Sequence, residues 1–292
     1  MCSGKYLDIN FNLYWRRIMR RLFYVFTILA LFSFASVATA FSADIELARK
    51  STLEKIMERG ELRVGFDPGY MPFEMTDKRG NYVGFDVDLA KEMAKAMGVK
   101  FVPVNIDFDG IISALLSKKF DIIISGMTVN QERNLQINFS DPYLVVGQTV
   151  LVNNKYKGKI KSYKDLNDPK YTVVSRIGTT GEMAAKRNIP KAKYKSFDKE
   201  ADGALEVSNG RADAWVYDFP FNVVFMAQHG GNVYHIDKPF TYEPLAFGIR
   251  KGDPDFMNWL NNFLRQIKND GRYDRIYDKW VKGDKWIDEV ME

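Results

Sequence analysis

The chain has 292 residues, a net charge of +5 and a single cysteine, Cys2. One cysteine excludes an intramolecular disulfide framework, and the length allows a large core without one. The positive charge is concentrated at the N-terminus, where residues 1–40 hold five cations (Lys5 and four arginines) against Asp8, which leaves about +1 for the rest. Beyond that segment no basic stripe with interleaved aromatic residues occurs, so we exclude a nucleic-acid partner.

The N-terminus has the pattern of an export signal. Four arginines at 16–21 precede an apolar run at 22–35 and an Ala-Thr-Ala sequence at 38–40. These are the charged, apolar and cleavage regions of a signal peptide, so we predict that residues 1–40 are removed and that the protein is periplasmic. An uncleaved membrane anchor is the alternative, but the run is short for a span. Met19 is an alternative start, in which case residues 1–18 are not translated. Cys2 precedes the apolar run, which argues against a lipoprotein.

Strands and helices alternate along the first part of the body. The pattern predicts strands at 61–66, 101–104 and 122–124 and helices at 87–97 and 110–117. Such alternation favours a mostly parallel sheet covered by helices on both faces.

A second unit repeats this organisation about a hundred residues later. Here the pattern predicts strands at 172–175 and 212–217 and helices at 183–187 and 202–208. Extended runs at 144–152 and 245–249 flank the unit, and an amphipathic helix at 254–268 follows it. We therefore predict two α/β lobes joined by two hinge crossings. Lobe 1 comprises residues 41–148 and 243–292, and lobe 2 comprises residues 149–242.

The segment 120–143 carries the strongest functional signal. A buried strand ends in Ser125-Gly126-Met127-Thr128, where we expect a helix to begin, and Arg133 follows one turn later. Backbone N–H groups at a helix start attract anions, and an arginine adds a two-pronged donor for a carboxylate. A crevice at the carboxyl ends of the strands, between the two lobes, is the expected site of a small carboxylate ligand.

Five segments resemble the periplasmic solute-binding proteins of the polar amino-acid type, which serve ABC importers. These segments are GYMPFE at 69–74, YVGFDVDLA at 82–90, residues 121–143, GTTGE at 178–182 and RADAWVYD at 211–218. The resemblance covers about residues 55–280 and implies a two-lobed, type II periplasmic-binding-protein fold. It further implies an amino-acid ligand, an inner-membrane ABC permease as partner, a monomer, and no cofactor.

The resemblance also implies roles for individual residues. Arg133, Thr128 and Thr180 would hold the ligand carboxylate. Gly126, through its carbonyl, and Asp218 would hold the ammonium. Ser125 belongs to the same loop, and Tyr70 and Phe108 would sandwich the ligand side chain.

Several of these assignments have structural alternatives. Thr128 and Thr180 are also good N-caps, and Asp218 could cap the turn before Pro220. Tyr70 and Phe108 could be core aromatics. His229 and His235 are two histidines without clustered partners, which we interpret as surface residues and not as a metal site.

The ligand side chain is the least determined feature. Asp67 or Glu74 could meet a cationic side chain, whereas Arg176 could meet that of glutamate or glutamine. We favour a cationic or polar amino acid, with lysine or arginine first.

Two other classes of protein remain possible on this fold. Cyclohexadienyl (arogenate or prephenate) dehydratases resemble amino-acid receptors and need a general acid, for which Glu182 is the nearest candidate. The sensing domain of a kinase or channel would need further segments that this sequence lacks. We therefore favour a receptor without catalytic activity.

Overall fold

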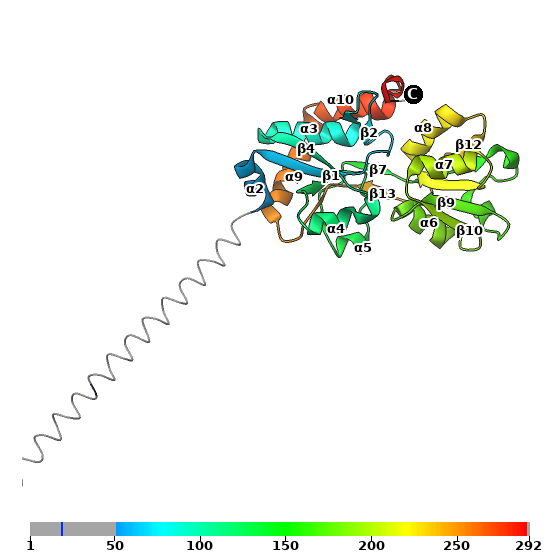
Figure 1. Cartoon of the computed structure of the whole chain (residues 1–292), viewed down its shortest axis with the longest axis horizontal. Coiled ribbons are helices and arrows are strands. Elements are labelled where there is room, and N and C mark those ends of the chain that lie inside the picture. The colour runs from blue at the N-terminus through cyan, green and yellow to red at the C-terminus, as the bar shows by residue number, and fades with distance from the viewer. Residues whose placement is uncertain (1–18, 20–50, 291–292) are drawn as a thin grey trace, which may run out of the picture. The chain divides into compact units, whose positions relative to one another are not determined.

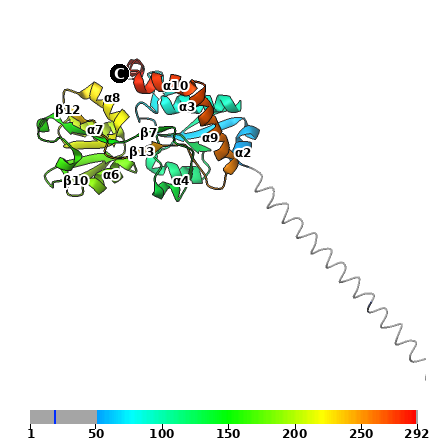
Figure 2. The same ribbon diagram turned by 180° about the vertical axis from the view of Figure 1, so that it is seen from behind.

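The computed structural model describes residue 19 and residues 51–290, so the predicted signal peptide lies outside the described residues apart from Met19. Two α/β lobes make up residues 52–290 (Figures 1 and 2). Among the residues described, no helix is both long and apolar enough to cross a membrane.

Lobe 1 is built on a five-stranded sheet of order β4-β1-β5-β14-β6. Three strands are parallel: β4 (Lys100–Asn105), β1 (Glu61–Phe66) and β5 (Ile122–Ile123). The strands β14 (Gly248–Ile249) and β6 (Asn138–Phe139) add an antiparallel edge. A small hairpin of β2 (Met75–Thr76) and β3 (Tyr82–Val83) lies beside it. The carboxyl ends of β1 and β5 therefore meet at one edge, where Asp67 and Ser125 follow.

Helices cover both faces of the lobe 1 sheet (Figure 1). On one side lie α3 (Phe85–Met97), whose apolar stripe is buried, and α10 (Arg272–Tyr277), and on the other lies α4 (Ile111–Leu116). The remaining helices are α2 (Thr52–Arg59), α5 (Gln131–Asn134), α9 (Pro254–Asn269) and α11 (Ile287–Val290). The amphipathic helix predicted at 254–268 is α9, and it packs on the lobe 1 core through Phe256, Leu260 and Phe263.

Lobe 2 has a similar sheet, of order β10-β9-β11-β8-β12. The parallel strands are β10 (Lys193–Phe197), β9 (Thr172–Arg176) and β11 (Ala214–Asp218). The antiparallel strands are β8 (Gln148–Asn153) and β12 (Val233–Ile236). The helices α6 (Thr180–Asn188), α7 (Glu200–Ser208) and α8 (Phe219–His229) cover this sheet. Arg176 and Asp218 thus end two neighbouring strands and lie at the same edge.

A two-stranded ribbon connects the lobes. It pairs β7 (Leu144–Val146) with β13 (Glu243–Leu245) in antiparallel register, so that Val146 lies opposite Glu243. We call these six residues the hinge ribbon. An additional bridge joins Thr128 to Leu245 on the other edge of β13. The extended runs predicted at 144–152 and 245–249 are each interrupted. The first divides into β7 of the ribbon and β8 of the lobe 2 sheet, and the second into the end of β13 and β14 of the lobe 1 sheet.

One local prediction about the segment after β5 is wrong. Residues 125–128 do not begin a helix, since α5 starts at Gln131 and spans four residues. Its N-cap is Asn130, whose side chain accepts from the Arg133 N–H at 2.8 Å. The segment 127–129 is instead extended and bonds to the hinge: the Val129 N–H donates to Pro244 O at 2.8 Å. The functional loop is therefore attached directly to the connection between the lobes.

Candidate functional site

A narrow cavity lies between the facing edges of the two sheets. Its walls come from lobe 1 through Tyr70, Glu74, Phe108, Gly126, Thr128 and Arg133, and from lobe 2 through Gln148, Arg176, Thr179, Thr180, Glu200, Tyr217 and Asp218. We call it the cleft. Its volume of about 10 Å³ is enough for at most one water molecule. A ligand larger than a water molecule can therefore enter only if the lobes move apart.

Asp218 is the acidic centre of the lobe 2 wall. One carboxylate oxygen accepts from the Tyr70 hydroxyl of lobe 1 at 2.5 Å, and the other accepts from Gln148 Nε2 at 2.6 Å. Burial raises the pKa of Asp218 to about 7, although the bonds from Tyr70 and Gln148 lower it. Asp218 precedes α8 but makes no side-chain cap bond to that helix. Its partners are therefore those of the cleft.

Arg133 is the cationic centre of the lobe 1 wall, and 5% of its surface is exposed. Its guanidinium donates to Thr128 O at 2.9 Å and, across the cleft, to Gly178 O at 3.0 Å. Within residues 51–290 no carboxylate oxygen lies within 4.0 Å of this guanidinium, whereas the Arg176 guanidinium has two carboxylate partners. Burial lowers the pKa of Arg133 to about 10, although Glu243 and Asp218 oppose this. The buried Arg133 guanidinium is thus held by backbone carbonyl groups and can still bind an anion.

The small residues of the loop bring backbone close to these two charges. Gly126 has a φ of 51°, and a Cβ there would lie 2.2 Å from the Tyr70 ring, so no larger residue fits without displacing Tyr70. The hydroxyls of Thr128 and Thr180 face each other across the cleft at 3.4 Å. Neither threonine is the N-cap that the sequence allowed, because Asn130 caps α5 and Thr179 caps α6. Thr180 is the first residue of α6, so its backbone N–H is at a helix start.

Asp67 and Arg176, predicted as alternative contacts for the ligand side chain, contact each other. Arg176 forms ion pairs with both Asp67 and Glu200, and all three are buried. Asp67 also accepts from the Phe108 N–H at 2.8 Å and from Lys199 Nζ at 3.2 Å. Asp67 is therefore already surrounded by donors, and Arg176 does not lie on a solvent face.

Two described residues that line the cleft, Glu74 and Gln148, each have a buried side-chain oxygen without a hydrogen-bond partner, and that of Glu74 belongs to a carboxyl group. One of the Glu74 carboxylate oxygens accepts from the Ser125 hydroxyl at 2.6 Å, while Oε2 is buried without a hydrogen-bond partner. Ser125 is thus a support for Glu74 and does not line the cleft. Burial and the nearby Asp86 raise the pKa of Glu74 well above its ordinary value. Asp86, held by the Gly126 N–H at 2.7 Å and the Tyr143 hydroxyl at 2.9 Å, has a pKa raised by burial to about 7.

The two predicted aromatic residues occupy different parts of the cleft. Tyr70 stacks on Phe73 with ring centroids 4.6 Å apart and meets Tyr217 of lobe 2 edge-on at 5.5 Å. The Phe108 ring lies between two guanidinium groups, 5.4 Å from Arg133 Cζ and 5.6 Å from Arg176 Cζ. Both line the cleft, and their role in sandwiching a ligand stays a prediction.

Sequence reasoning missed several residues of the cleft. Gln148, Glu200 and Tyr217 line it. Glu200 and Tyr217 share a hydrogen bond of 2.8 Å. The signal for Gln148 was its position next to the predicted crossing, and for Tyr217 its position before Asp218. His235, expected at the surface, is half-buried and contacts Thr149 Oγ1 at 2.8 Å. No cluster of three metal-ligating side chains occurs in the part of the chain that the structure describes.

The family model for bacterial extracellular solute-binding proteins, family 3, matches residues 62–283. The chain belongs to this family. A solved protein described as a binding component of an ABC transporter from Wolinella succinogenes, complexed with lysine, is 57% identical, with a TM-score of 0.76 and coverage of 79% of this chain and 99% of that one. The predicted two-lobed, type II periplasmic-binding fold is therefore confirmed.

Two further similarities connect this family member to an enzyme. A reconstructed ancestral amino acid-binding protein, a precursor of cyclohexadienyl dehydratase, is 52% identical with a TM-score of 0.75, and the match covers 79% of this chain and 100% of that one. The cyclohexadienyl dehydratase of Pseudomonas aeruginosa is 27% identical over 249 residues, which is 85% of this chain and 92% of the relative. The family therefore contains both binding proteins and an enzyme.

Proposed function

We propose that this protein is the receptor of an ABC importer and captures one free amino acid with a cationic side chain, lysine or arginine, between its lobes. The observation that carries the proposal is the opposition of Arg133 and Asp218. A buried cation without a carboxylate partner and a buried carboxylate flank the same cleft, from different lobes. A zwitterion supplies the complementary charges, so Arg133 would hold its carboxylate and Asp218 its ammonium, with Thr128, Thr180 and the Gly126 carbonyl beside them.

Capture would couple binding to closure. Since each lobe carries only part of the complementary groups, the ligand is fully bonded only when both lobes contact it. The ligand ammonium would take the place of the Tyr70 hydroxyl at Asp218, and Tyr70 and Phe108 would then face the ligand side chain.

The charges of the cleft favour a cationic side chain. Four buried carboxyl groups, from Asp67, Glu74, Glu200 and Asp218, face the two buried guanidinium groups of Arg133 and Arg176. Burial raises the pKa of Glu74 and of Asp218, so a ligand with a positive side chain would favour loss of their protons and pair with the carboxylates that result. Because Asp67 is already paired with Arg176, we propose Glu74 Oε2 as the acceptor of the ligand's terminal cation. The lysine in the similar Wolinella succinogenes structure supports this class.

We further propose the cellular context given by the resemblance. The protein would be exported through cleavage of residues 1–40, remain in the periplasm as a monomer, and deliver its ligand to an inner-membrane permease. Residues 41–148 with 243–292 and residues 149–242 would be its two domains, which join at the hinge ribbon, although Gln148 itself pairs in the lobe 2 sheet.

The direct test is isothermal titration calorimetry of the refolded protein, from residue 41 onward, with lysine, arginine, glutamine and glutamate. Lysine or arginine should bind with a submillimolar Kd and one site per chain. A preference for glutamate would transfer the side-chain contact from Glu74 to Arg176. Absence of binding by all four amino acids would contradict the proposed function.

A dehydratase is the second candidate, and one observation favours it. Glu74 is a buried acid with a raised pKa in the cleft, which is the property of a general acid. Glu182, the candidate chosen from the sequence, does not line the cleft, and it pairs with Lys186 at 2.7 Å. Incubation with prephenate and arogenate separates the two functions. Turnover that disappears in Glu74→Gln would establish the enzyme, and stable substrates would favour the receptor.

A further inference from the structure

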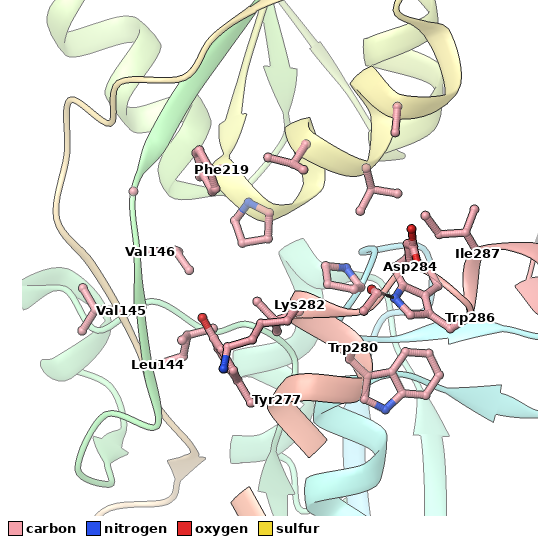
Figure 3. Close-up of a pocket in the computed structure, with 18 of the residues that line it drawn as sticks. Leu144, Val145, Val146, Phe219, Tyr277, Trp280, Lys282, Asp284, Trp286 and Ile287 are labelled. Atoms are coloured by element: carbon pink, nitrogen blue, oxygen red, sulfur yellow. Dashed lines mark hydrogen bonds between the residues drawn. The ribbon is translucent and has the colours of Figure 1, made fainter. Parts of the chain in front are cut away.

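A second and much larger hollow lies between the lobes, and its walls are mostly apolar, with Lys282 and Asp284 as charged members (Figure 3). It encloses about 620 Å³. We call it the rear groove. Lobe 2 supplies Phe219, Val223 and Ala227, which share one face of α8 at a spacing of four residues. Lobe 1 supplies Trp286 and Ile287 from its C-terminal segment, and β7 of the hinge ribbon lines one side.

The cleft and the rear groove lie on opposite edges of the hinge ribbon. On one edge, Thr128 of the cleft bridges to Leu245 of β13. On the other edge, the residues of β7 (Leu144–Val146) line the rear groove. Because β7 pairs with β13, the order across the ribbon is Thr128, β13, β7 and then the rear groove.

Neighbouring residues in the chain also divide between the two hollows. Asp218 lines the cleft whereas its neighbour Phe219 lines the rear groove. Likewise, Gln148 lines the cleft whereas its neighbour Gly147 lines the rear groove. The hinge ribbon therefore borders both hollows, which makes it the axis about which one lobe would rotate against the other.

The walls of the rear groove expose apolar surface that has no covering in this arrangement of the lobes. Phe219 is 37% exposed, Val223 43% and Val145 49%. Exposed apolar side chains that gather around one hollow mark a surface that gains free energy when it is covered. The cleft, at about 10 Å³, is closed, whereas the rear groove, at about 620 Å³, is open.

We propose that the rear groove closes when the cleft opens, and that the apolar contact made across it stabilises the open form. α8 (Phe219–His229) is the moving wall and the segment 280–287 is the wall that it meets. The contact opposes the ligand, because every ligand that closes the cleft must also separate these walls. The groove thus sets the affinity of the cleft without touching the ligand. This inference rests on the proposed receptor function, in which the lobes part to admit an amino acid.

The test uses Val223→Glu, which places a charge on the moving wall, and Ile287→Glu on the opposite wall. Each should weaken the apolar contact of the open form and shift the protein toward closure. Small-angle scattering without amino acid should give a smaller radius of gyration than for the unchanged protein. Calorimetry should give a Kd for lysine that is lower by roughly threefold or more, because a larger fraction of the protein is competent to close.

Two comparisons make the result specific. The double variant Val223→Glu with Ile287→Lys puts opposite charges on the two walls, so it should restore the radius of gyration and the Kd toward their original values. Met57→Glu changes an apolar side chain of similar exposure, 51%, on α2 of lobe 1, away from both hollows, and should change neither quantity.

The possible results separate this inference from the proposed function. A Val223→Glu protein that matches Met57→Glu in both radius of gyration and Kd would overturn the inference, and so would a weaker Kd in both single variants with unaltered thermal melting. Because the scattering measurement contains no amino acid, it still decides the inference if lysine does not bind.

Discussion

The Tyr70 hydroxyl of lobe 1 donates to the Asp218 carboxylate of lobe 2 at 2.5 Å. This contact joins the lobes at the position that the proposed function gives to a ligand ammonium. Asp218 therefore has the neutral Tyr70 hydroxyl as its partner without a ligand and would have a cationic ammonium group with one. Its protonation should report which of the two partners is present.

The first prediction concerns pH. The pKa of Asp218 is about 7 in the folded protein, above the ordinary 3.8, because the group is buried. Between about pH 4 and 7 the folded form then binds a proton that the unfolded chain releases, so the free energy of unfolding falls as pH rises through this interval. Without amino acid, urea unfolding should give greater stability at pH 5 than at pH 8, by up to about 2.7 kcal/mol from this group, because about two pH units of its titration fall in this interval at about 1.36 kcal/mol each.

A matched variant isolates the contribution of Asp218 to this slope. Asp218→Asn cannot ionise, so its stability should vary less between pH 5 and pH 8 than that of the unchanged protein. With lysine present, the ionised carboxylate is the binding form, and the Kd should rise as the pH falls below 7. An identical pH slope in Asp218→Asn would exclude the assigned pKa shift.

The second prediction concerns Arg133. Arg133→Ala should weaken lysine binding by ~2–5 kcal/mol, because the ligand carboxylate would be buried without its charge partner. Calorimetry measures the loss directly. Arg133→Lys keeps the charge but loses the two-pronged guanidinium, so its Kd should lie between those of the unchanged protein and Arg133→Ala. A change of less than about threefold would remove Arg133 from the carboxylate site.

The third prediction concerns selectivity. Glu74→Gln keeps the shape but cannot lose a proton to pair with a cation, so binding of lysine should weaken by about 2 kcal/mol or more while binding of glutamine is maintained. The measured quantity is the ratio of the two Kd values. The same ratio in both proteins would mean that Glu74 does not contact the ligand side chain. Asp255→Asn, at an exposed position of α9 in lobe 1, serves as the control for charge alone.

The fourth prediction concerns folding stability. Arg176→Leu leaves Asp67 and Glu200 buried without their guanidinium, which should cost about 3–5 kcal/mol in the free energy of unfolding. Combining it with Glu200→Gln should recover part of that loss, since one unpaired charge is removed. Equal stability of the single and double variants in urea would show that water reaches these carboxylates.

The sequence was sufficient for the parts of this protein that repeat a regular pattern. The strand at 61–66 and the amphipathic helix at 254–268 were predicted almost to the residue, because burial on one face produces a visible period. The start of α5 was missed, since Ser125 and Thr128 are typical N-caps that here bond across the chain to Glu74 and the hinge.

The pairing of Arg176 with Asp67 could not be predicted either. The two residues lie 109 positions apart and on different lobes, so each one taken alone looked like a contact for a ligand. Only the closed arrangement of the lobes shows that their charges neutralise each other. The orphan oxygen of Glu74 is likewise a property of the assembled cleft.

The hinge ribbon has one more consequence. Val146 and Glu243 face each other in its two strands, so the chain leaves lobe 1 and returns to it at points about 5 Å apart. The intervening segment is therefore a cassette whose two ends fit a single pair of positions on its host. Such a segment can be exchanged between relatives by joining the chains at the ribbon, and a family could combine two cleft walls of separate ancestry without redesigning either core.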